Sequence, residues 1–230
     1  MGEKLLWKGC SDGKVEDVRT LLQNSHTNTN WQDSELLRTP LYIACQNGHV
    51  GIVKLLLNEA RVDLNKGNKN DATPFFIACQ QGHIGIVKLL LNNEKVDINK
   101  PTNEGCTPFY VACSFGQIEI VELLLNDNRV DINKALNSGG TPFYIVCQFG
   151  YIDIVKLLVK DKRIDINKAK NDGATPFYIA CQFGYLDIVK CLLESGREID
   201  INKKWNNTKT PLDISKERSN STQKFSWETE

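Results

Sequence analysis

The chain has 230 residues, of which 41% are hydrophobic and 24% are charged. This composition is typical of a folded chain and excludes a collagenous or intrinsically disordered one. The 28 lysines and arginines balance 28 aspartates and glutamates, so the formal net charge is zero. Binding to nucleic acid needs a basic surface, and we therefore expect no nucleic-acid partner.

Apolar runs such as Leu55-Leu56-Leu57 are far shorter than the roughly 20 residues that cross a bilayer. The first dozen residues also lack the apolar core of a secretory signal. We therefore expect no membrane insertion and a cytoplasmic or nuclear location.

Residues 1–38 contain the first pair of predicted helices. Leu5-Leu6-Trp7 supplies apolar residues for the first helix, and apolar residues from Val15 to Leu22 follow the helical spacing of a second. Gly13 lies between them, at a position where a glycine can end a helix.

From residue 39 onward the sequence repeats. The dipeptide Thr-Pro recurs at intervals of 34, 34, 34, 34 and 35 residues. Threonine is a favourable N-cap and proline suits the first helical position, so each dipeptide predicts the start of a helix. The threonines are Thr39, Thr73, Thr107, Thr141, Thr175 and Thr210.

Each repeat continues with the same sequence features. A glycine about nine residues later predicts the end of the first helix, and apolar residues at helical spacing, such as Val50, Val53 and Leu56, predict a second. The segment that follows is rich in Asn, Asp and Gly, which predicts an extended turn or hairpin finger. The glycines are Gly48, Gly82, Gly116, Gly150 and Gly184.

A two-helix unit of this size cannot bury its apolar face alone, so the repeats must stack on one another. We expect five complete repeats, at residues 39–72, 73–106, 107–140, 141–174 and 175–209. Residues 1–38 are interpreted as a degenerate N-terminal capping repeat, 210–215 as a partial C-terminal capping repeat and 216–230 as a polar tail. In that tail, Phe225 and Trp227 could fold back over the last repeat or form a short docking peptide.

The segment TPLYIACQNGHVGIVKLLLNEARVDLN, from Thr39 to Asn65, resembles an ankyrin repeat. The resemblance extends through five repeats and, with the caps, over nearly the whole chain. It implies an all-α fold, an ankyrin-repeat solenoid of stacked helix-turn-helix units with hairpin fingers, which binds another protein on its concave face. One departure is that Tyr or Phe stands where the family has the histidine of Thr-Pro-Leu-His, as at Tyr42.

Five cysteines occupy the same position of the predicted first helix, and we expect all five to be buried, reduced thiols. Cys106, beside a predicted finger, is the cysteine that we expect to be exposed. The five are Cys45, Cys79, Cys113, Cys147 and Cys181.

The sequence contains none of the phosphate-binding, dinucleotide-binding, zinc-protease or hydrolase motifs. The spacing of Cys45 and His49 supplies only two potential ligands per repeat, where a structural zinc site needs four. We therefore expect no enzymatic activity, no cofactor and no metal site.

Differences among the repeats indicate where a partner would bind. The residue before the helix-ending glycine is Phe115, Phe149 or Phe183 in repeats three to five. Large exposed aromatic residues often anchor interfaces, and the resemblance implies that this position faces the concave groove. The alternative is that these rings pack against one another or against Tyr151 and Tyr185.

Two apolar residues at the expected finger tips form a second candidate contact set, because a solvated tip would be polar. They are Leu136 and Trp205.

We therefore predict a non-catalytic scaffold or adaptor that acts as a monomer and binds a protein of unknown identity. The alternative is a substrate-recruiting or regulatory subunit of a larger enzyme complex.

A third hypothesis makes the chain a modification substrate. One asparagine per repeat resembles the asparagines that are hydroxylated in some ankyrin repeats, although these side chains could instead cap the turn. They are Asn65, Asn99, Asn133, Asn167 and Asn202.

Overall fold

The computed structural model describes residues 2–206 and 208–217, which are almost entirely helices and connecting loops. The named helices are α1 Gly2–Asp12, α2 Val15–Gln23, α3 Pro40–Gln46, α4 Val50–Leu57, α5 Pro74–Gln80, α6 Ile84–Leu91, α7 Pro108–Ser114, α8 Ile118–Leu125, α9 Pro142–Phe149, α10 Ile152–Leu158, α11 Pro176–Phe183 and α12 Leu186–Leu193. Residues 211–217 are also helical. Phe225 and Trp227 of the predicted tail lie outside the described residues.

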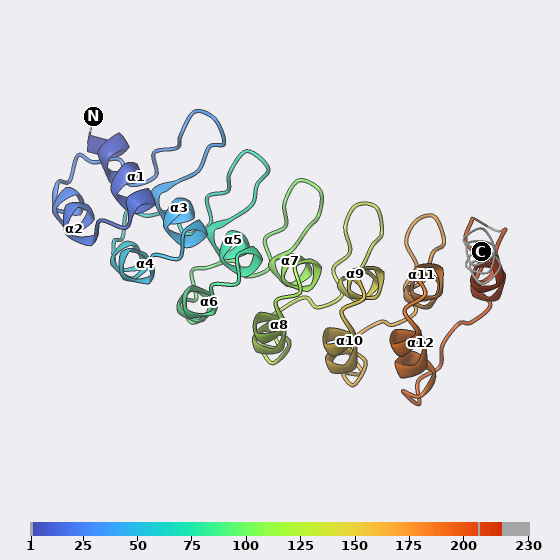
Figure 1. Ribbon diagram of the computed structural model, residues 1–230. Coiled ribbons are helices and arrows are strands. Elements are labelled where there is room, and N and C mark those ends of the chain that lie inside the picture. The colour runs from blue at the N-terminus through green and yellow to red at the C-terminus, as the bar shows by residue number, and fades with distance from the viewer. Residues whose placement is uncertain (1, 207, 218–230) are drawn as a thin grey trace, which may run out of the picture. The chain divides into compact units, whose positions relative to one another are not determined.

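By their contacts, the helices form two compact units. Among the described residues, the first contains 2–112 and 123–130, and the second contains 113–122, 131–206 and 208–217, so that the division falls within α7 and α8. In the first unit α1, α3 and α5 pack in one row and α2, α4 and α6 in a second (Figure 1). In the second unit α9 packs on α11 and α10 on α12 in the same manner.

The predicted helix starts are confirmed by the hydrogen bonds at the Thr-Pro dipeptides. Thr39 Oγ1 accepts a hydrogen bond from the backbone N–H of Tyr42 at 3.1 Å, and the proline that follows Thr39 occupies the first turn. The same cap forms in the other four repeats. These caps satisfy a backbone donor that would otherwise be buried without a partner at the start of each first helix.

The glycines at the predicted ends of the first helices adopt the left-handed conformation. Gly48 has φ 78°, and Gly150 and Gly184, with φ 78° and 72°, are the C-caps of α9 and α11. A residue with a Cβ is strained in this conformation, which is why the sequence places glycine there.

Most of the predicted buried cysteines lie in the core, but two cysteines differ from expectation. Cys45, Cys79 and Cys147 are completely buried, and burial raises their pKa. Cys181 is only partly buried, because it lies on α11, beyond which the described residues supply only one further first-row helical segment, 211–217. Cys106 is partly buried rather than exposed, and desolvation raises the pKa of its thiol to about 12.

Each finger is a loop closed by two backbone hydrogen bonds, one of which runs from the N–H of Asp71 to the carbonyl of Asn68 at 2.8 Å in the first full repeat. The N–H of Asn68 donates to the carbonyl of Ala72 at 2.9 Å, and the same bond recurs at the equivalent place in the other repeats. Within the described residues, the only ladder pairing is the isolated bridge between Trp205 and Lys209.

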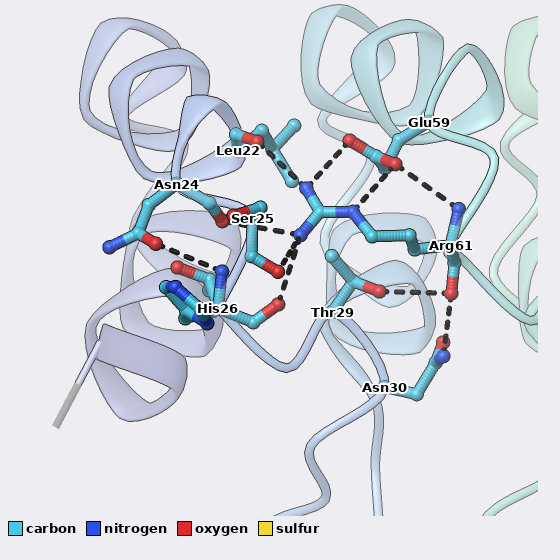
Figure 2. Close-up of polar contacts among 9 residues, drawn as sticks. Leu22, Asn24, Ser25, His26, Thr29, Asn30, Glu59 and Arg61 are labelled. Carbon is cyan, nitrogen blue, oxygen red and sulfur yellow. Dashed lines mark hydrogen bonds and ion pairs between the residues drawn. The ribbon is translucent and has the colours of Figure 1, made fainter.

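An arginine in the loop after the second helix joins neighbouring repeats. Arg61 Nη2 donates to the carbonyl of Leu22 at 2.8 Å, near the end of α2, and Nη1 donates to the carbonyl of Ser25 at 2.9 Å. Glu59 holds the guanidinium from the other side at 2.9 Å (Figure 2). Arg129 repeats this arrangement by donating to the carbonyl of Leu91, the last residue of α6, at 2.9 Å. The arginines thus supply donors to helix-end carbonyls that lack partners within the helix.

None of the helices in residues 2–206 and 208–217 combines the length and apolar character needed to cross a membrane.

Candidate protein-binding surface

Three phenylalanines project from equivalent positions at the ends of α7, α9 and α11. Phe115 follows α7 directly, and Phe149 and Phe183 are the last residues of α9 and α11. Their exposed fractions are 53%, 47% and 41%, whereas Phe143, at the start of α9, is 1% exposed. All three belong to the second compact unit. We call Phe115, Phe149 and Phe183, with Tyr151 and Tyr185, the aromatic surface.

Two tyrosines support this surface from the following turn. The rings of Phe149 and Tyr151 have centroids 5.9 Å apart at an interplanar angle of 45°, and those of Phe183 and Tyr185 are 5.9 Å apart at 20°. Such pairs stabilise aromatic rings by about 0.5–1.5 kcal/mol beyond their buried area. Phe149 and Phe183 therefore pack against the tyrosines and still present about half of their surface to solvent.

Each tyrosine ring lies against the helix-ending glycine of the repeat before its own. A Cβ placed on Gly116 would meet Tyr151 Cζ at 3.2 Å, and one placed on Gly150 would meet Tyr185 Cζ at 2.8 Å. In the first unit His49 lies over Gly13 in the same way, and its Nε2 is 3.0 Å from the carbonyl oxygen of Ser11. Each glycine thus leaves room for the ring of the next repeat as well as providing the left-handed turn.

The residues beside the three phenylalanines are uncharged. Ser114, Gln148 and Gln182 precede them in the helices. Exposed carboxylates of the same repeats lie on the second helices, at Glu119, Asp153 and Asp187. The aromatic surface is therefore chemically suited to apolar or neutral polar side chains of a partner.

The residues predicted at the finger tips begin the loop instead, and they are partly buried. Leu136 and Trp205 donate the backbone hydrogen bonds that close their loops. The Trp205 ring packs against Tyr178, with centroids 5.9 Å apart. At the same position of the preceding repeat, Lys170 Nζ lies 5.6 Å from the centroid of the Tyr144 ring. This position therefore contacts the first helix of its own repeat and is less available to a partner than the aromatic surface.

The candidate asparagines form a ladder between repeats. Asn65 Nδ2 donates to the carbonyl of Lys95 at 2.7 Å, and its Oδ1 accepts from the N–H of Asp97 at 2.7 Å. The turn itself is capped by aspartate, since Asp63 Oδ1 accepts from the N–H of Asn65 at 3.0 Å. Donation of the amide to the next repeat recurs at three further positions, Asn99, Asn133 and Asn167. The ladder gives these side chains a structural role, and their hydroxylation stays a prediction.

The described residues include no cluster of three or more His, Cys, Asp or Glu side chains arranged to hold a metal ion. Desolvation raises the pKa of Cys10 to about 12 and that of Cys181 to about 11, which lowers the reactive thiolate fraction of both residues.

A second apolar feature, which the sequence analysis missed, lies at the C-terminal end of the second unit. Leu186, Leu193 and Leu212 are 69%, 55% and 60% exposed and line a groove of about 610 Å³. The feature of the sequence that could have indicated this groove is the polar segment after Ile214, where the earlier repeats have the apolar residues of a second helix.

Comparisons with known proteins identify the fold family. The family model for ankyrin repeats, which holds three copies of the repeat, matches residues 6–100, 60–135 and 128–205. The crystal structure of the human ASB11 ankyrin repeat domain is similar, with a TM-score of 0.77 and 25% sequence identity over 91% of this chain and 90% of that chain. A search of curated protein sequences finds no significant match. The chain belongs to the ankyrin repeat family.

Proposed function

We propose that this chain is a non-catalytic scaffold or adaptor that binds a protein partner through the aromatic surface. Ankyrin repeats generally mediate protein–protein interaction. The observation that carries the proposal is the exposure of Phe115, Phe149 and Phe183, which are 53%, 47% and 41% accessible at one repeated position.

The physical reason is that half-exposed aromatic rings still have area to bury. The rings of Phe149 and Phe183 already pack against Tyr151 and Tyr185, so little further side-chain entropy is lost when a partner covers them. Interface hot spots are typically such aromatic anchors surrounded by contacts that exclude water. Leu136 and Trp205, which are partly buried, contribute less in this proposal.

The experiment is affinity capture from a lysate with the wild-type chain and the Phe115→Ser/Phe149→Ser/Phe183→Ser variant. The matched control is Glu119→Ser/Asp153→Ser/Asp187→Ser, which changes three exposed residues on the second helices of the same repeats. Circular dichroism first confirms that all three proteins are folded. A protein retained by the wild type and the control, but lost from the phenylalanine variant, supports the proposal.

A further inference from the structure

The rings of the aromatic surface recur with the spacing of the packed helices. In the second unit α9 and α11 pack on each other, and Phe149 and Phe183 are the last residues of these two helices. Equivalent positions on packed helices lie about 8–10 Å apart. A partner segment that crosses these repeats therefore meets one half-exposed phenylalanine about every 8–10 Å.

The tyrosines connect the rings of neighbouring repeats. Tyr185 packs against Phe183 of its own repeat, with ring centroids 5.9 Å apart. A Cβ placed on Gly150 of the preceding repeat would meet Tyr185 Cζ at 2.8 Å, and Gly150 directly follows Phe149. Tyr185 thus links Phe183 with the helix end that carries Phe149, and the partner meets a row of aromatic rings.

We propose that the aromatic surface binds an uncharged, proline-rich segment of the partner in the polyproline II conformation, with every third residue a proline that faces the rings. Each of these prolines packs on the rings of one repeat. The inference rests on the proposed function, and it names the chemistry of the partner segment.

The spacing of the rings favours this conformation over an extended strand. Polyproline II has three residues per turn and rises about 3.1 Å per residue, so every third residue returns to the same side after about 9.3 Å. Same-side residues of a strand recur after about 6.7 Å or about 13 Å, and neither distance matches the repeat. Strand addition also needs a sheet edge, whereas the isolated bridge between Trp205 and Lys209 is the only such pairing in the described residues.

A polar side chain beside the rings suits the backbone of such a segment. Polyproline II makes no internal hydrogen bonds, so its carbonyls can accept hydrogen bonds from the protein that binds it. Gln148 directly precedes Phe149 in α9, and its side-chain amide has no hydrogen-bond partner among the described residues. This amide can donate to a carbonyl of the segment. The carbonyls of an α-helix are already bonded within the helix, except in its last turn.

The absence of charge next to the rings favours the same class of partner. Each phenylalanine lies between an uncharged polar residue and a glycine, as in Gln148-Phe149-Gly150. A charged segment would lose hydration at this row without gaining an opposite charge from these neighbours. A proline-rich segment combines apolar rings with an uncharged, hydrogen-bonding backbone, and it therefore matches the surface in charge as well as in spacing.

The test begins with a selection of random phage-displayed peptides on the full chain. The peptides have about 12 residues, which span about 37 Å in polyproline II and can cross the three repeats. The Phe115→Ser/Phe149→Ser/Phe183→Ser variant, shown by circular dichroism to be folded, is the target for counter-selection. The proposal predicts that the enriched peptides are uncharged and carry prolines at intervals of three residues.

Calorimetric titration with one enriched synthetic peptide then tests the predicted hydrogen bond. Gln148→Leu should weaken binding of the peptide by about fivefold, the usual effect of one lost hydrogen bond. Gln46→Leu is the matched control, because Gln46 has the same position in the first full repeat but is followed by Asn47 instead of a phenylalanine. It should bind the peptide like the wild type.

The possible results separate this inference from the proposed function. Enriched peptides that need the phenylalanines but lack the proline pattern, such as peptides with apolar residues at helical spacing, would overturn the inference and leave the proposed function intact. Peptides that bind the wild type and the phenylalanine variant equally would overturn both, and so would an absence of enrichment on the wild type.

Discussion

Phe149 and Tyr151 contact each other across the turn that joins α9 to α10, with ring centroids 5.9 Å apart, while Phe149 keeps 47% of its surface exposed. The contact fixes the ring without covering it. A rigid, half-exposed aromatic side chain can be buried by a partner at low entropic cost. The pair therefore links the packing of the repeat to the proposed binding role.

Replacing Phe149 with alanine should leave the fold nearly intact, because about half of its ring is already in water. We expect a loss of no more than about 1.5 kcal/mol in the free energy of unfolding. Phe143, in the same helix, is 1% exposed, and its replacement by alanine should cost about 3–5 kcal/mol. Urea denaturation of both variants tests the contrast, and similar losses would contradict the assignment of Phe149 to the surface.

Gly150→Ala should disturb the aromatic surface as well as the turn. Any Cβ is strained at φ 78°, and here it would also approach Tyr185 Cζ to 2.8 Å. Gly196, at φ 69°, has no atom within 4 Å of such a Cβ, so Gly196→Ala is the matched control. We expect Gly150→Ala to lose about 0.5–1.5 kcal/mol more, as Tyr185 leaves its contact with Phe183. Equal losses in thermal or urea denaturation would count against this packing.

The contact of Glu59 with Arg61 predicts a specific acid sensitivity. Hydrogen bonds from the Arg61 side chain hold the pKa of Glu59 at about 2, below its ordinary value of 4.5. Because the folded-state pKa is lowered, the stabilisation is complete above about pH 4.5 and is lost as the pH falls towards 2. In the Glu59→Gln variant, the free energy of unfolding should therefore fall less steeply than in the wild type as the pH is lowered from about 4.5 to 2. Parallel curves for the wild type and the variant would contradict the prediction.

Asn65→Asp should weaken the ladder between the first two full repeats. A carboxylate can still accept from the N–H of Asp97, but it cannot donate to the carbonyl of Lys95. We expect a loss of about 1 kcal/mol in unfolding free energy, and Asn70→Asp, at an exposed loop position, controls for the added charge. No difference between the two variants would show that the ladder contributes little.

The local signals in the sequence were sufficient to predict the repeat. Thr39-Pro40 predicted the start of α3, and Gly48 predicted its end, because capping depends on residues within one turn. Phe149 was predicted to be exposed because it lies one residue before the helix-ending Gly150, a position that the family resemblance places on the concave groove. It is 47% exposed.

Contacts between repeats were harder to predict because they join residues more than 30 positions apart. The hydrogen bond from Arg61 to the carbonyl of Leu22 was missed. The sequence pattern Asp/Glu-x-Arg nevertheless recurs, with Glu59, Asp127 and Asp161 as its first residues. The expected exposure of Cys106 was wrong for the same reason, since burial depends on how the finger folds over its repeat. The groove lined by Leu186, Leu193 and Leu212 was missed because predicting it requires knowing which described helices pack on one another.

The measurement that tests the central claim most directly is the affinity of a captured partner for the three single variants Phe115→Ala, Phe149→Ala and Phe183→Ala. The account predicts that at least one variant weakens binding by about 30-fold, the effect of an interface hot spot of about 2 kcal/mol. Asp153→Ala, on the second helix of the same repeat as Phe149, should bind like the wild type. Unchanged affinity in all three phenylalanine variants, with their folding intact, would contradict binding through the aromatic surface.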